Sequence, residues 1–324
     1  MPSWPSSPLH RDVLLGPDQF ANAASGMLAK VDILSAGELP SRIRQIQSHG
    51  KWAIDLPQFN CALRASGEMD RGSVVVLAVQ RACESTICGI PLEDDMIMTI
   101  PAGTTVTASI QPGLSYAGAV VPTAIWRGIQ AAAAGVIVER AADHPSAVRL
   151  APRQGRSFRN RIEVLADRLA AIADNPTQLE HLPIAFIEYL GGLAEAHAVA
   201  HDRDPRIDRS SGRLLRQART AENFIHTHIR EEIPIIRLCR EVGVSRRQLE
   251  YAFRTTFGVS PSEFIRALRL NEARRQLATA RKNDLSVTRV AMDVGIAHLG
   301  RFAARYRSLF GESPKETMLR ARGL

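Results

Sequence analysis

The sequence predicts an α+β protein of several domains: an N-terminal β-barrel or β-sandwich, a helical connector, and a C-terminal all-α domain with two helix-turn-helix units. Three observations support this fold class. Short strand-like segments separated by turn residues run from about Phe20 to Val138. Apolar residues recur at helical spacing over 157–200, and one helix-turn-helix pattern occurs twice within 213–324.

The N-terminal domain, expected over 1–140, alternates apolar runs with turn signals. Its clearest apolar runs are 73–79, 96–100 and 104–110, and each is bounded by glycine or proline. Several short strands at roughly ten-residue spacing are typical of a β-sandwich or a small barrel.

The connector follows a stretch, 141–156, whose two prolines and scattered charge predict an irregular connection. Apolar residues then fall at spacings of four and three, which indicates an amphipathic helix, at Phe158, Ile162, Leu165, Leu169 and Ile172. Asn175-Pro176 is expected to end this helix, and a second one follows. The apolar seam either forms a dimer contact or packs on its own domain. A polar linker, 202–212, should let the C-terminal domain fold and move separately.

The repeated unit lies in the C-terminal domain. Leu238 to Val244 align with Val290 to Ile296 at an offset of 52, whereas beyond the turn Leu249 aligns with Phe302 at an offset of 53. The second turn is therefore one residue longer. We predict helix-turn-helix units at about 235–257 and 287–310. Two such units in one chain make sequence-directed binding to double-stranded DNA the first hypothesis.

Start and stop signals frame these helices. Gly258 and Gly311 stand where the second helix of each unit should end in a left-handed cap. Capping boxes begin at Ser245, Ser260 and Ser313. Between the units, 261–277 is predicted to be one helix of roughly 25 Å. Recognition helices held apart in this way can enter successive major grooves, some 34 Å apart, at an asymmetric half-site.

The charge of the chain is concentrated in the same domain. From Gly212 to Leu324 there are 22 Lys and Arg against 11 Asp and Glu, whereas the other 211 residues carry 19 against 22. A basic end joined to a near-neutral body is expected of a polyanion-binding module. A merely solvated charged face is the alternative.

The first recognition helix should bury Leu249, Phe253 and Phe257 and expose its other face. The expected DNA-binding residues of this unit are Ser245, Arg246, Arg247, Gln248, Glu250, Tyr251 and Arg254. Arginine can donate to O6 and N7 of guanine, glutamate can accept from N4 of cytosine, and tyrosine can contact a phosphate or a thymine methyl group. Arg246 and Arg254, at the edges, are expected phosphate contacts. An ion pair within the helix is the alternative for Glu250.

The second recognition helix keeps the core positions Phe302, Tyr306 and Phe310. Its expected DNA-binding residues are His298, Leu299, Arg301 and Arg305. Because Leu299 and Gly300 occupy the opening turn, we expect this unit to depend more on phosphate contact and methyl packing than on hydrogen bonds to bases. A helix-start cap or a plain surface position is the alternative for His298.

At these positions the chain resembles the AraC/XylS family of bacterial transcriptional regulators. The likeness runs from near Leu214 to Leu319 and includes the following residues: Gly243-Val244-Ser245, Phe253, Gly258, Pro261, Arg269-Leu270, Ala273, Val290-Ala291, Gly295, Phe302, Phe310-Gly311 and Pro314. It implies a seven-helix DNA-binding domain that contacts promoter DNA and recruits or blocks RNA polymerase. By position, Arg247, Glu250 and Tyr251 would face bases, and Leu299, Gly300 and Arg301 would take the corresponding places in the second unit. The chain departs from the family pattern at Cys239, Ile296 and Leu299-Gly300.

The N-terminal domain is similar to the cupin-like ligand-sensing domains of that family in strand pattern and domain order. This resemblance implies an unknown small-molecule effector in the N-terminal domain and a homodimer formed through the helices after the barrel. We therefore expect a ligand-responsive transcription factor, an activator or a repressor, whose effector shifts the population of two arrangements.

Enzymatic interpretations find little support in the residues, and we expect neither an enzyme nor a cofactor. The isolated His10, His49 and His144 do not form a metal site. A DNA-repair alkyl-transfer protein is the main enzymatic alternative, but it needs an activated cysteine, which the spacing of Cys61, Cys83 and Cys88 does not supply. Nonspecific architectural DNA binding is a third alternative.

Location is expected to be cytoplasmic, with no membrane partner. No apolar run approaches the roughly 18 residues of a membrane span, and residues 1–5 lack the charged and apolar regions of a secretory signal. The four cysteines are too sparse to predict a disulfide framework.

Overall fold

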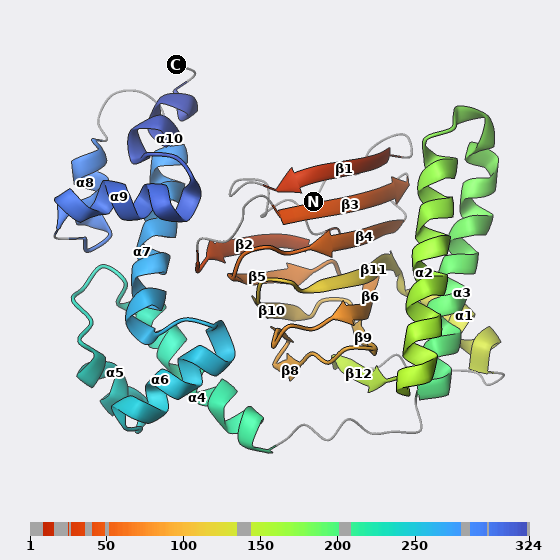
Figure 1. Cartoon of the computed structure of the whole chain (residues 1–324), viewed down its shortest axis with the longest axis horizontal. Coiled ribbons are helices and arrows are strands. Elements are labelled where there is room, and N and C mark those ends of the chain that lie inside the picture. The colour runs from red at the N-terminus through yellow and green to blue at the C-terminus, as the bar shows by residue number, and fades with distance from the viewer. Residues whose placement is uncertain are drawn as a thin grey trace.

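The computed structural model describes residues 9–15, 25, 27–35, 41–48, 52–134, 144–200, 209–279, 286–296 and 298–322. Three bodies lie side by side in it: a helical bundle, a β-domain in the middle, and a second helical domain that contains the C-terminus (Figure 1). Among the described helices, none combines the length and the hydropathy needed to cross a membrane.

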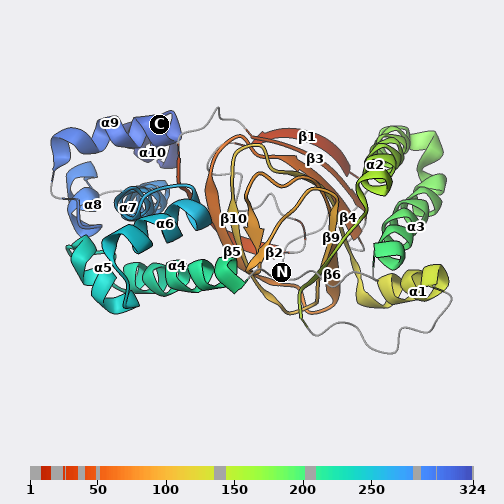
Figure 2. The ribbon, with the colours of Figure 1, turned by 60° about the horizontal axis from the view of Figure 1, so that its bottom comes forward.

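The β-domain consists of two antiparallel sheets that face each other (Figure 2). The seven-stranded sheet contains, in spatial order, β1 (Leu9–Leu15), β3 (Ser41–Ser48), β4 (Trp52–Gln58), β11 (Ser115–Pro122), β6 (Ser73–Arg81), β9 (Met96–Ile100) and β12 (Ser146–Arg149). The five-stranded sheet contains β2 (Met27–Ile33), β5 (Leu63–Met69), β10 (Thr105–Ile110), β7 (Thr86–Ile87) and β8 (Ile90–Pro91). Of the two predicted architectures, the sandwich is therefore correct and the closed barrel is not.

Burial on both faces explains the nearly continuous apolar strands of the larger sheet. In β6, Val75 and Leu77 join the core between the sheets, whereas Val74 and Val76 join a second core beneath the helical bundle. Successive side chains of a strand point to opposite faces, so a strand covered on both sides has to be apolar at every position.

Helices cover the outer face of the seven-stranded sheet (Figures 1 and 2). They are α1 (Thr123–Ala134), α2 (Pro152–Ala173), the 3-10 helix η2 (Pro176–His181) and α3 (Leu182–Ala200). The predicted seam of α2 faces this sheet, with Ile162, Leu169 and Ile172 buried in the core. The seam therefore packs on its own domain and is not free to form a dimer contact. Asn175 accepts a hydrogen bond from Thr177 N at 3.1 Å and so caps η2 where α2 was predicted to end.

Two segments differ from the prediction. Residues 146–149 of the expected connection form β12, which pairs with β9, and Pro152 starts α2 because proline suits the first turn of a helix. Residues 141–143 of that connection lie outside the described residues. Helix α1 was not predicted, because its run of small apolar residues has no polar face with helical spacing.

Seven helices form the C-terminal part of the described chain. They are α4 (Arg209–Thr227), α5 (Ile235–Val242), α6 (Arg246–Phe257), α7 (Pro261–Ala278), α8 (Val287–Asp293), α9 (Leu299–Phe310) and α10 (Pro314–Ala321). Both predicted helix-turn-helix units are confirmed, as α5–α6 and α8–α9. Of the predicted polar linker, 202–208 lies outside the described residues, and its remainder is the start of α4.

The C-terminal domain does not stand apart from the β-domain. A single hydrophobic core contains Leu63 and Ile110 of the five-stranded sheet together with Ala221 of α4 and Leu268 of α7. In this structure the two domains are packed together, contrary to the expectation that the basic end would be separate.

Candidate DNA interface and interior cavity

The first turn is built as its sequence predicts. Gly243 adopts the left-handed conformation with φ of 70°, and Val244 N donates to Cys239 O at 3.0 Å. Gln248 N donates to Ser245 Oγ at 3.2 Å, and Ser245 N donates to Gln248 Oε1 at 3.0 Å. This capping box satisfies amide groups at the start of α6. The side chains of Ser245 and Gln248 are thus engaged in starting the recognition helix.

The exposed face of α6 carries the predicted DNA-binding residues. Leu249, Phe253 and Phe257 are buried, which turns the opposite face to solvent. There Arg246, Arg247 and Arg254 are exposed, Tyr251 is 61% exposed, and Glu250 is half-buried. Within the described chain, no salt bridge joins Glu250 to an arginine of its helix, so its carboxylate is available to a ligand.

The second unit has a similar frame but a different opening turn. Phe302, Tyr306 and Phe310 are buried as predicted, and the Tyr306 hydroxyl lies 2.9 Å from Thr317 Oγ1. His298 occupies the N-cap position of α9, as its alternative interpretation had it, but its side chain makes no capping hydrogen bond. Leu299 is half-buried against the core, which leaves Arg301 and Arg305 as the exposed polar side chains predicted for this helix.

Three arginines, Arg266 of α7 together with Arg301 and Arg305 of α9, lie close enough for their charges to interact. Burial and the neighbouring charges of Arg266 and Arg301 lower the pKa of Arg305. None of the three forms a salt bridge with a carboxylate in the described ranges. Arg266 and Arg305 also line an open cleft of about 700 Å³ between the two units. Like charges that form no salt bridge create a positive potential that favours a polyanion such as a DNA backbone.

Helix α7 separates the two units (Figure 1). Ser260 and Glu263 form a capping box at its start, and Leu268, Ala273 and Leu277 are buried. Its 18 residues give a length of about 27 Å at 1.5 Å per residue. The helix is continuous, as the sequence predicts, and acts as a rigid spacer.

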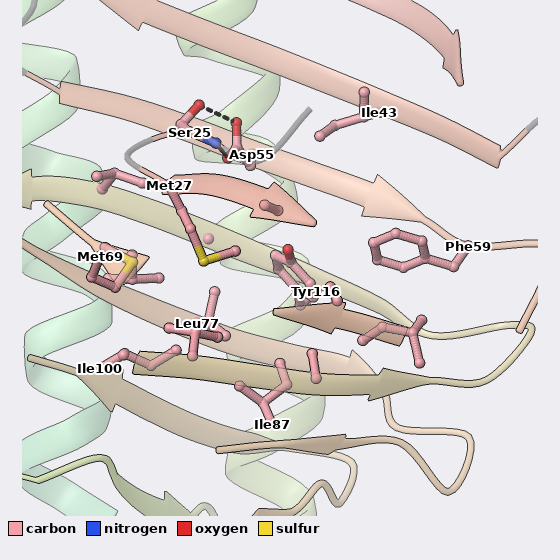
Figure 3. Close-up of a pocket in the computed structure, with 18 of the residues that line it drawn as sticks. Ser25, Met27, Ile43, Asp55, Phe59, Met69, Leu77, Ile87, Ile100 and Tyr116 are labelled. Carbon is pink, nitrogen blue, oxygen red and sulfur yellow. Dashed lines mark hydrogen bonds between the residues drawn. The ribbon is translucent and has the colours of Figure 1, made fainter. Parts of the chain in front are cut away.

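An interior cavity of about 110 Å³ lies between the two sheets of the β-domain (Figure 3). Most of its wall is apolar, for example Met27, Leu77 and Ile100. Asp55 is the ionisable carboxyl among the described lining residues: it is only 7% exposed and accepts hydrogen bonds from Ser25 N and Ser25 Oγ, both at 2.9 Å. Burial raises the pKa of Asp55, although the hydrogen bonds from Ser25 and Gln45 act in the opposite direction.

The strands that line the cavity also hold the C-terminal domain, with alternate residues on the two faces. In β5, Leu63 and Ala65 line the cavity, whereas Arg64 donates from Nε to Glu222 Oε1 of α4 at 2.5 Å. In β10, Ala108 lines the cavity, and Ser109 Oγ donates to Thr256 O of α6 at 2.5 Å.

The same arrangement is found in β2. Val31 lines the cavity, and Asp32 accepts a hydrogen bond from Arg275 Nη1 of α7 at 2.7 Å. Strands with side chains on both faces therefore connect the cavity to α4, to α6 of the first helix-turn-helix unit, and to the spacer α7.

Sequence reasoning missed Asp55 and the contacts between the domains. The signal for Asp55 was its place as a single acid in the apolar strand β4, because burying a carboxylate is unfavourable unless it has partners. The contacts between the domains had no signal in the local sequence. Among the described residues, no group of three or more His, Cys, Asp or Glu side chains is arranged to hold a metal ion.

Comparison with known proteins places a helix-turn-helix domain family on residues 238–320. The chain is 30% identical over 166 residues to the probable thc operon regulatory protein of Rhodococcus erythropolis, which is 51% of this chain and 49% of that protein. It is 38% identical over 95 residues to the XylDLEGF operon transcriptional activator of Pseudomonas putida, which is 29% of this chain and 30% of that protein. The chain thus spans about half the length, or less, of these relatives.

The chain is also similar in part to a solved structure. A probable AraC family transcriptional regulator from Rhodopseudomonas palustris CGA009 is 36% identical, with a TM-score of 0.32. The likeness covers 33% of this chain and 98% of that one.

Proposed function

Because the chain belongs, through its C-terminal domain, to the AraC/XylS family of transcriptional regulators, we propose that it binds a specific promoter sequence and regulates transcription in response to a small molecule. The observation that carries this proposal is the pair of helix-turn-helix units at the two ends of one rigid helix, whose exposed faces carry arginines that form no salt bridge within the described ranges. Such a pair can place two recognition helices in successive major grooves of one duplex.

The two units contact the DNA in different ways. In the first, Arg247, Glu250 and Tyr251 face bases, because they form the middle of the exposed face of α6. Arg246 and Arg254 flank them and bind phosphates. In the second, Leu299 contributes to the core, so Arg301 and Arg305 bind the DNA mainly through phosphates and His298 is a peripheral contact.

The cavity is the effector site. Along its strands, residues that line the cavity alternate with residues that contact α4, α6 and α7. A ligand that moves β2, β5 or β10 therefore moves the surface against which the DNA-binding domain packs. The effector then shifts the population between two orientations of that domain. RNA polymerase is the partner that this orientation would affect.

The protein forms a homodimer through the helical bundle. Val164 of α2 is 66% exposed, and Ile184 and Ile187 of α3 are 61% and 48% exposed. These large apolar side chains lie outside the seam that α2 buries on its own domain. Exposed aliphatic residues on two neighbouring helices can form a contact surface.

The repair alternative is not favoured. Burial raises the pKa of Cys61, which is fully buried, and burial also raises the pKa of Cys88. An alkyl-accepting cysteine instead needs a lowered pKa and access to DNA.

Competition binding tests the proposal. The full chain is used to select duplexes from a random pool, and the selected sequence is compared with a scrambled one at physiological salt. We expect the selected duplex to bind at least about a thousandfold more tightly. Equal affinity for both would instead indicate nonspecific binding.

A further inference from the structure

The wall of the cavity between the sheets indicates the chemistry of its ligand. Among the described residues that line it, Asp55 is the ionisable carboxyl, Tyr116 and Ser25 supply hydroxyl groups, and none is Lys, Arg or His. Among these described lining residues, an anionic ligand would therefore find no cation to pair with.

Asp55 is held as a hydrogen-bond acceptor. Its Oδ1 accepts from Ser25 Oγ at 2.9 Å and from Gln45 Nε2 at 2.7 Å, and its Oδ2 accepts from Ser25 N at 2.9 Å. Arg11 Nε donates to Gln45 Oε1 at 2.6 Å, which turns the amide so that its NH₂ group faces Asp55. A carboxylate has about four lone-pair positions, so Oδ2 can accept one more hydrogen bond.

The cost of this arrangement shows what is missing. Burying a carboxylate is unfavourable, and burial accordingly raises the pKa of Asp55, although the nearby charge of Arg11 acts in the opposite direction. Burial, together with the charge of Asp55, also raises the pKa of Tyr116 on the same wall. A cationic donor inside the cavity would remove this cost, whereas a second anion would increase it.

We propose that the cavity binds a small, mainly apolar amine, whose ammonium group donates a hydrogen bond to Asp55. The inference rests on the proposed function, in that it takes this cavity to be the effector site. The volume of about 110 Å³ is similar to that of a cavity that holds one benzene ring, roughly 150 Å³. A single ring or a short branched chain fills the apolar part.

Four probes of one shape test the proposal on the full chain by titration calorimetry at pH 7. Benzylamine, benzyl alcohol, toluene and benzoate share the ring and differ in the group that meets Asp55. We expect benzylamine to bind about tenfold or more tightly than benzyl alcohol, because a charge-assisted hydrogen bond is stronger than a neutral one. Benzoate should bind weakest. The proposal is overturned if benzoate binds as well as benzylamine, or if benzylamine does not bind.

Two variants locate the binding. Asp55→Asn keeps the shape of the side chain and removes its charge, so the affinity for benzylamine should fall close to that for benzyl alcohol. Glu68→Gln, which removes an exposed acid of β5, is the control and should leave the preference for benzylamine unchanged. A preference for benzylamine that survives Asp55→Asn contradicts the proposal. If Asp55→Asn does not fold, Ala65→Leu fills the cavity without touching the charge. Binding of benzylamine that survives Ala65→Leu would place the amine elsewhere and contradict the proposal as well.

DNA binding measured on the same preparation distinguishes a failure of the ligand proposal from a failure of the proposed function. DNA selectivity without amine binding would reject the ligand class and leave the regulator intact. Amine binding without DNA selectivity would reject the proposed function and leave the cavity chemistry intact.

Discussion

Asn271 of α7 pairs with the backbone of Ile33 in β2 as a neighbouring strand would. Ile33 N donates to Asn271 Oδ1 at 3.0 Å, and Asn271 Nδ2 donates to Ile33 O at 2.8 Å. Strand β2 is an edge of the five-stranded sheet, so these backbone groups would otherwise lack a partner. The spacer between the two DNA-binding units is thereby fixed to the wall of the cavity.

Replacing Asn271 should loosen this attachment. Asn271→Ala leaves two buried backbone groups of Ile33 unsatisfied, and each should lower the free energy of unfolding by about 1–3 kcal/mol. We expect faster hydrogen exchange at the Ile33 amide and a lower free energy of unfolding, measured by urea denaturation. Gln276→Ala, on the same helix, is the control and should change neither. Unchanged exchange at Ile33 in Asn271→Ala would show that the pair does not hold the domains together.

The contact between Arg64 and Glu222 should depend on pH. Burial raises the pKa of Glu222, but hydrogen bonds from His226 and Arg64, together with their charges, outweigh it, so the pKa lies below the ordinary 4.5. Because the folded pKa is lowered, ionised Glu222 stabilises the folded chain above about pH 4.5, and this contribution is lost as the pH falls through the lower folded pKa.

Stability measured between pH 6 and pH 3 tests this dependence. In Glu222→Gln, we expect the stability to be lower at pH 6 and the acid-induced decrease to be shallower than in the wild type. If the two pH profiles run parallel, Glu222 contributes nothing to the dependence.

The arginines of the second unit should act on phosphates. We expect Arg301→Ala and Arg305→Ala each to weaken binding to all duplexes alike and to reduce the slope of log affinity against log salt by about one. Arg213→Ala, on α4, is the matched control and should leave the slope unchanged. A loss of affinity confined to the selected sequence would instead make these residues base contacts.

Arg247 should discriminate between bases. We expect Arg247→Ala to weaken binding to the selected duplex by about 1–3 kcal/mol and to relax the preference at one base pair. Binding measured on a panel of single-base variants checks this outcome. A uniform loss on the whole panel would reassign Arg247 to a phosphate.

The bundle surface should control the oligomeric state. We expect Ile184→Lys to shift sedimentation from dimer to monomer, because it places a charge in an apolar contact. Ala132→Lys, at an exposed position of α1, is the control. A wild-type chain that sediments as a monomer at micromolar concentration would exclude the dimer.

Local signals made the C-terminal domain predictable from sequence. The capping boxes at Ser245, Ser260 and Ser313 all form, and Gly258 and Gly311 end their helices in left-handed conformations, with φ of 72° and 77°. Each signal involves residues close together in the chain, so the surrounding fold does not alter it.

Contacts between distant residues were not predictable in this way. Asn271 and Ile33 are 238 residues apart, and an asparagine in the middle of a helix is ordinarily a solvent-facing residue. The apolar seam of α2 had two interpretations because a helix periodicity does not say which surface it meets. The role of Asp55 likewise depends on Ser25 and Gln45, which other strands and turns bring to it.

Nuclease footprinting of the full chain on its selected duplex at low ionic strength tests the central claim most directly. The account predicts one asymmetric protected region that covers two successive major grooves, some 34 Å apart on one face of the duplex. In Arg247→Ala, protection should weaken first at the groove that α6 occupies. A folded chain that protects no stretch of duplex, or protects a single groove only, would contradict the assignment of two DNA-binding units on one rigid helix.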